Sequence, residues 1–90
     1  MFEYDPDKSA VNLAKHGINF EQAQDLWADD RRLIIATHPG QNGEMRALVV
    51  AMIAERLWSA VITARGEAIR IISVRRARDD EKELYYGQDD

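Results

Sequence analysis

Five arginines lie between Arg65 and Arg78, near the end of a 90-residue chain whose formal net charge is -4. Glu67 is the one acid among them, which gives this stretch a local charge of +4, whereas residues 79–90 carry -5. Charges interact over roughly 8 Å at physiological salt, so a compact basic patch can attract phosphate while the rest of the surface stays acidic. Because guanidinium groups bind phosphate oxygens through paired hydrogen bonds, we expect a nucleic-acid contact in this stretch.

The arginines where the last strand meets the last helix are the strongest candidates. Strict alternation along residues 68–75 turns Arg75 to one face of the strand and Arg70 to the other, so they share no phosphate unless a bulge or the strand end intervenes. The N–H groups that open the following helix can also bind an anion. We predict that RNA phosphate is bound by Arg70, Arg75, Arg76 and Arg78. The acids at residues 79–83 offer a structural alternative as the anions that these arginines meet.

Side chains able to move protons lie at two further places in the chain. Lys15 and His16 stand together before a glycine, and Glu44 shares one face of a predicted strand with Arg46. The imidazole of His16 titrates nearest neutrality, and a carboxylate such as Glu44 can do so when it is desolvated. The predicted catalytic residues are Lys15, His16, Glu44, Arg46, Arg75 and Tyr85, and the sequence leaves open which is the base and which the acid.

Each of these candidates also has a structural alternative. The Lys-His pair can complement the negative end of a helix dipole. Glu44 and Arg46 can form an exposed ion pair that contributes little to stability. Glu81 and Tyr85, four residues apart, can lie on one side of a helix and attach it to the sheet.

The composition argues against several other kinds of site. The chain has no cysteine, which excludes disulfides and thiolate metal sites. His16 and His38 lack the spacing of metal ligands, so we predict no metal and no cofactor. No apolar run has the length of a signal peptide core or of a membrane-spanning helix, so we expect a cytoplasmic protein without a membrane partner.

The N-terminal part of the sequence predicts two helices. Asp5 can cap a first helix with Pro6 at its first position, and Gly17 can end that helix. Asn19 can cap a second helix, with Gln22 at the position that completes a capping box.

The rest of the chain predicts strands and a last helix. Branched apolar residues with short connections indicate antiparallel strands over residues 33–37, 46–53, 57–64 and 68–75. Residues 79–86 predict a C-terminal helix with acids in its first turn. We therefore expect a single α+β domain, residues 1–90, in which helices cover one face of a four-stranded antiparallel sheet. A short extra strand over residues 1–4 is compatible with this pattern.

Several short motifs follow one another in a fixed order. Residues 2–5 read FEYD, residues 15–17 read KHG and residues 70–73 read RIIS. The other members of the set are Lys8, Asn12, Phe20, Ala23, Glu44, Arg46, Arg75, Ala77, Glu81 and Tyr85. This ordered set resembles the BrnT family of bacterial toxins over nearly the whole chain.

The resemblance implies a RelE-like fold and a ribonuclease toxin of a type II toxin–antitoxin system. Such a toxin cuts RNA without a metal, by directing a ribose 2′-OH at its own phosphate, and so inhibits translation. The implied partners are RNA and a neutralising ribbon-helix-helix antitoxin of the BrnA type, with operator DNA bound only through the toxin–antitoxin complex. The alternative is a non-catalytic module of RelE/ParE fold that inhibits a protein target or serves only as a partner of the antitoxin.

Overall fold

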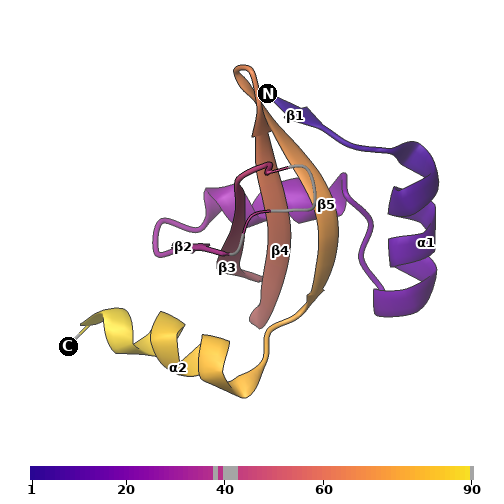
Figure 1. The fold of residues 1–90 in the computed structure, drawn as a ribbon. Coiled ribbons are helices and arrows are strands. Elements are labelled where there is room, and N and C mark those ends of the chain that lie inside the picture. Colours follow the sequence, from indigo (N-terminus) through magenta and orange to yellow (C-terminus); the bar gives the residue numbers. More distant parts are fainter. Residues whose placement is uncertain (38, 40–42, 90) are drawn as a thin grey trace.

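The computed structural model describes residues 1–37, 39 and 43–89, except for the side chain of residue 89, and shows a twisted sheet flanked by helices (Figure 1). The helices are α1 (Pro6–His16), the 3₁₀ helix η1 (Gln22–Ala28), α2 (Asp79–Tyr86) and the short 3₁₀ helix η2 (Gly87–Asp89). The strands are β1 (Phe2–Glu3), β2 (Leu33–Ala36), β3 (Arg46–Ile53), β4 (Arg56–Arg65) and β5 (Ala68–Arg76). The predicted α+β class is confirmed, and His38 lies outside the described residues. Across the described part of the chain, no helix is long and apolar enough to cross a membrane.

Helix α1 forms where its caps predict it. The Asp5 carboxylate accepts a hydrogen bond from the Asp7 N–H at 2.8 Å, and Pro6 occupies the first turn. Gly17 ends the helix with a φ of 80°, a conformation that glycine adopts without steric cost. Both predicted boundaries of this helix are confirmed.

The second predicted helix forms as the 3₁₀ helix η1 and not as an α-helix. Asn19 and Gln22 do exchange the two predicted capping hydrogen bonds, at 2.7 and 2.9 Å. Ala23 and Leu26, three residues apart, are both fully buried. Because a 3₁₀ helix places residues i and i+3 directly above each other, the tighter turn directs both side chains into the core.

The sheet contains five strands in the described residues, in the order β1-β5-β4-β3-β2. Strands β2 to β5 form the predicted antiparallel meander. The predicted count of four is one too few, because β1 joins the edge of β5 in parallel orientation, with Phe2 opposite Ile69. The Ile69 N–H donates to the Met1 carbonyl oxygen at 2.9 Å, which ties the N-terminus to the sheet.

Helices cover both faces of the sheet, so the prediction of a single covered face is wrong. Val49 of β3 is buried in a core that includes Leu26 of η1, and we call this the α1-side face. The next residue, Val50, is buried in a second core with Tyr85 of α2, and we call this the α2-side face. Residues that alternate along β3 therefore enter two different cores, which explains the unbroken apolar run of this strand.

A β-bulge in β5 changes the predicted orientation of the arginines. Val61 lies opposite Ser73, but the next residue, Ile62, lies opposite Ile71, so Ile72 is an extra residue in the ladder. As a result, Arg70 pairs with Thr63 and Arg75 pairs with Ser59. Thr63 and Ser59 lie on the same face of β4, because they are four positions apart. The expectation that Arg70 and Arg75 face opposite sides is therefore wrong, and both lie on the α2-side face.

Candidate functional site

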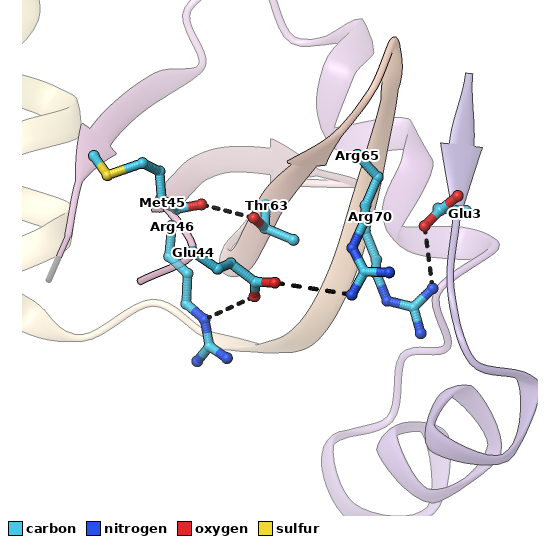
Figure 2. Close-up of polar contacts among 7 residues, drawn as sticks. All are labelled: Glu3, Glu44, Met45, Arg46, Thr63, Arg65 and Arg70. Atoms are coloured by element: carbon cyan, nitrogen blue, oxygen red, sulfur yellow. Dashed lines mark hydrogen bonds and ion pairs between the residues drawn. The ribbon is translucent and has the colours of Figure 1, made fainter. Parts of the chain in front are cut away.

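Polar side chains form a row across four strands on the α2-side face (Figure 2). Arg46 of β3 lies opposite Thr63 of β4, Thr63 lies opposite Arg70 of β5, and Arg70 lies opposite Glu3 of β1. Neighbouring strands are about 4.8 Å apart, which places the backbones of Arg46 and Arg70 roughly 10 Å from each other. We call these four residues the cross-strand row.

The cations in and beside this row are held by partly exposed ion pairs. Arg70 Nη1 lies 3.2 Å from Glu3 Oε1, and Arg46 Nε lies 3.4 Å from Glu44 Oε1. The second oxygen of Glu44 lies 3.8 Å from Arg65 Nη2, so two guanidinium groups share one carboxylate. The exposed fractions of the Arg46, Arg65 and Arg70 side chains are 38%, 52% and 28%. These cations are therefore open to solvent and to an incoming anion.

Arg75, the central residue of the predicted phosphate site, is 25% exposed and is paired with an acid of α2. Its Nη1 and Nη2 atoms each donate a hydrogen bond of 2.8 Å to the Glu81 carboxylate. Glu81 also accepts hydrogen bonds of 2.8 Å from the Ser59 hydroxyl and from the Arg78 N–H. The hydrogen bonds from Arg75 lower the pKa of Glu81 to about 2, although its burial acts in the opposite direction. The acid of α2 thus meets Arg75, as the structural alternative for this arginine expected.

Two of the other predicted phosphate ligands, Arg76 and Arg78, do not converge with Arg75. Arg76 lies opposite Trp58, on the α1-side face, and its guanidinium carbon is 5.4 Å from the centroid of the Trp58 ring. Arg78 is exposed and serves as the N-cap of α2. The sequence cluster RRAR is therefore divided between two faces and a helix end.

Tyr85 is a buried anchor of α2. Its hydroxyl donates a hydrogen bond to Asp29 Oδ2, and the residue is 4% exposed. Burial, followed by the contact with Asp29, raises the pKa of Tyr85 to about 12. Burial alone would raise the pKa of Asp29, but hydrogen bonds from Tyr85 and from backbone N–H groups lower it below its ordinary value. Glu81 and Tyr85 thus attach α2 to the rest of the fold.

Lys15 and His16 lie in the last turn of α1, beside β5. With the bulge residues Ile72 and Ser73 and with Lys8, they line a groove of about 320 Å³. Glu44 and Arg46, by contrast, lie at the start of β3, two strands away from β5. The structure thus separates the predicted proton-transfer residues into two places.

A family model of ribonuclease toxins, BrnT, of type II toxin–antitoxin systems matches residues 4–81. The chain belongs to this family. No curated protein matches the chain. As a BrnT-family member the protein is a ribonuclease toxin, and its system includes a cognate antitoxin.

Three residues in and beside the cross-strand row were not predicted as site residues. Glu3 lies in the short extra strand that the sequence only allowed for. Arg65 was counted among the five arginines but received no role in the site. Thr63 is 4% exposed, and its hydroxyl donates to the Met45 carbonyl oxygen at 2.7 Å. A polar residue inside the apolar stretch of residues 57–64 is the sequence signal that marks this position. Within the described residues, no three carboxylate or histidine side chains converge as metal ligands do.

Proposed function

We propose that this BrnT-family ribonuclease binds single-stranded RNA across the α2-side face, with backbone phosphates at Arg46, Arg65 and Arg70. The main support for the proposal is the β-bulge at Ile72. With this bulge, Arg70 lies opposite Thr63 and on the same face as Arg46. Three half-exposed guanidinium groups around two carboxylates give this end of the face a positive balance. Arginines in such an arrangement can exchange a carboxylate for a phosphate oxygen.

The chemistry we propose is attack by a ribose 2′-OH on the adjacent phosphorus, without a metal ion. Glu44, which contacts two guanidinium groups, accepts the 2′-OH proton. The 2′-oxygen bonds to phosphorus, the bond to the 5′-oxygen breaks, and water returns a proton to that leaving oxygen. The products are a 2′,3′-cyclic phosphate and a 5′-hydroxyl. Arg46 and Arg70 stabilise the charge that builds on the phosphate oxygens, which is the kind of interaction that lowers a barrier most.

The proposal also covers the type of fold and the partners of the protein. We propose a RelE-like fold, a ribbon-helix-helix antitoxin of the BrnA type, and binding of operator DNA only through the toxin–antitoxin complex. The net charge of -4 supports this division of roles, because the toxin alone has little bulk attraction for duplex DNA. Cleavage of cellular RNA by the free toxin then inhibits translation.

The test is cleavage of a defined single-stranded RNA by purified protein in EDTA. Arg70→Ala should lower kcat/KM about 100-fold, the usual effect of removing one charge-matched donor. The matched control is Arg76→Ala, which removes the same charge from the same strand but on the α1-side face. It should change kcat/KM less than about threefold. Equal losses in the two variants, or wild-type activity that EDTA abolishes and Mg²⁺ restores, would refute the proposed site or its chemistry.

The assay also identifies the general base. We expect Glu44→Gln to lower kcat about 100-fold or more, because the amide cannot accept the proton. His16→Gln should change kcat less than about threefold. The opposite result would move the proton transfer to the groove between α1 and β5, where Lys15 and His16 lie.

A further inference from the structure

The two edges of the sheet differ in what covers their outer backbone groups. On the β5 side, β1 covers the first half of the edge, and the Asn12 side chain covers the second half. The Asn12 amide donates to the Val74 carbonyl oxygen at 2.9 Å and accepts from the Val74 N–H at 3.2 Å, as a neighbouring strand would. On the other side, β2 pairs only with β3, and no further strand among the described residues covers it.

The register identifies which backbone groups of β2 point outward. The Thr37 N–H donates to the Arg46 carbonyl oxygen at 3.1 Å, so these two residues occupy a hydrogen-bonded position of the ladder. Such pairs alternate with pairs whose N–H and C=O groups point away from the partner strand. The backbone groups of Ile34 and Ala36 therefore face outward. They form a template of donors and acceptors for one more strand.

Apolar side chains are exposed beside this template. Ile34 is 56% exposed and Met45 is 66% exposed, whereas Val49 and Ala51 on the same sheet are fully buried. A groove of about 320 Å³ continues from β2 across the sheet. Its lining is mainly apolar and comprises Ala36, Met45, Arg46, Ala47, Ile62, Thr63, Ala64 and Ile69. An apolar patch next to an open edge is typical of a surface that another chain covers.

We infer that the β2 edge and this groove bind an extended segment of the cognate antitoxin, which adds a sixth strand beside β2. Backbone hydrogen bonds to Ile34 and Ala36 would supply affinity, and alternate apolar side chains of the segment would enter the groove. The charges favour a segment that also carries an acid. Arg46 and Arg65 share the single carboxylate of Glu44, so this group of three side chains carries a net positive charge.

A second copy of the toxin fits this surface less well. A β2–β2 pair would bring together only two outward-facing residues from each copy. An antitoxin segment can continue beyond both ends of β2, toward the larger area that a stable interface requires. The membership of the chain in a toxin–antitoxin family supplies such a partner.

This placement also suggests how binding can inhibit the ribonuclease. Arg46 lies on β3, so it is two strand spacings, roughly 10 Å, from a strand added beside β2. A carboxylate on that strand and the long side chain of Arg46 can span this distance together. Inhibition by this route rests on the RNA site proposed above, whereas the docking of the antitoxin does not.

The test measures the affinity of purified toxin for its purified cognate antitoxin at fixed salt. Ala36→Pro removes one outward N–H and no hydrogen bond of the β2–β3 ladder, a change that edge strands tolerate. Ile34→Glu places a charge on the apolar patch. Each variant should raise Kd at least tenfold. Leu84→Glu on α2 is the matched control, because Leu84 is 55% exposed, and it should change Kd less than threefold.

Amide hydrogen exchange gives a second readout that needs no variant. The Ile34 and Ala36 N–H groups should exchange rapidly in the free toxin and become protected in the complex. Unchanged exchange at both positions, or wild-type Kd for Ala36→Pro and Ile34→Glu, would overturn the inference. A dimer of the toxin alone that Ala36→Pro converts to monomer would assign the edge to a second copy instead. RNA cleavage by free Ala36→Pro should stay at the wild-type rate, which separates this result from any failure of the RNA site.

Discussion

Two sets of arginines share the α2-side face and differ in every contact. Arg75, at the α2 end, holds Glu81 through two hydrogen bonds of 2.8 Å, and the Glu81 side chain is 9% exposed. Arg46 and Arg65, at the other end, share Glu44 at 3.4 and 3.8 Å, and this acid is 27% exposed. The Arg75–Glu81 pair is short and has two hydrogen bonds to a buried acid, although Arg75 itself is 25% exposed, whereas the pairs around Glu44 are long and share one partly exposed acid.

Clustering of arginines in the sequence is therefore a poor guide to their roles. A buried pair is costly to break because the remaining charge has no partner. An exposed pair contributes little to stability, so its arginines can change partners at little cost. We therefore expect the Arg75 pair to maintain the fold and the pairs around Glu44 to serve the substrate.

The largest effect should follow from removing Arg75. Arg75→Ala leaves the Glu81 carboxylate buried without its main partner, which should lower the free energy of unfolding by about 3–5 kcal/mol. Urea denaturation of the purified variant measures this loss. Arg65→Ala is the control, because it removes an equal charge from a half-exposed pair. If both variants lost the same stability, the contrast between the two ends of the face would be wrong.

The pH dependence of the free energy of unfolding should also report on the Arg75–Glu81 pair. Glu81 has a pKa of about 2 in the folded protein and an ordinary pKa near 4.5 when unfolded. Its stabilising contribution is therefore complete above pH 4.5 and is lost as the pH falls from 4.5 toward 2, by about 3 kcal/mol. Urea denaturation of wild type and Glu81→Gln across this pH range isolates the contribution of Glu81 to the free energy of unfolding. We expect the stability of the variant to fall less steeply, and parallel curves would argue that Glu81 is not the titrating group.

The local structure of this chain was largely predictable. Asp5, Pro6 and Gly17 fix the ends of α1 through short-range cap chemistry, and the four strands of the meander appear where branched apolar residues alternate with turns. Such signals depend on residues close in sequence. They do not say which face of a sheet a helix will cover, and so the position of α2 on the second face was missed.

The candidate site was less predictable, because it depends on one residue of register. Ile72 is apolar on either face, so nothing in the sequence marks it as the extra residue of a bulge. Without the bulge, Arg70 is assigned to the wrong face and its neighbour Thr63 receives no role. The pairing of Arg75 with Glu81 likewise requires α2 to be docked, which is a tertiary event.

A smaller effect should follow from the second anchor of α2. Tyr85→Phe removes the hydroxyl that donates to Asp29, while Asp29 keeps hydrogen bonds from the Arg31 and Met52 N–H groups. We expect a loss of about 1.5 kcal/mol in the free energy of unfolding, typical of a hydrogen bond to a charged group.

The alkaline behaviour of Tyr85 gives this prediction a distinct signature. The pKa of Tyr85 is about 12 when folded and 10.0 ordinarily, so its contribution is present below pH 10 and is lost as the pH rises from 10 toward 12. Tyr85→Phe should lack that decline, which thermal denaturation at several pH values can follow. A variant that declines in parallel with wild type would show that the hydroxyl is not buried against Asp29 in solution.

Removing Arg65, at the end of the face away from α2, should have the smallest effect on stability. Its effect should appear in RNA binding instead. Arg65 is 52% exposed and lies 3.8 Å from Glu44, so Arg65→Ala should change the free energy of unfolding by less than about 1 kcal/mol. If Arg65 contacts one phosphate, the slope of log affinity against log salt for an uncleavable 2′-deoxy analogue should fall by about 0.7. Arg56→Ala, on the hairpin between β3 and β4, is the control and should leave the slope unchanged. Equal changes in both slopes would mean that RNA senses only the total charge of the protein, and the two ends of the face would then differ in stability but not in function.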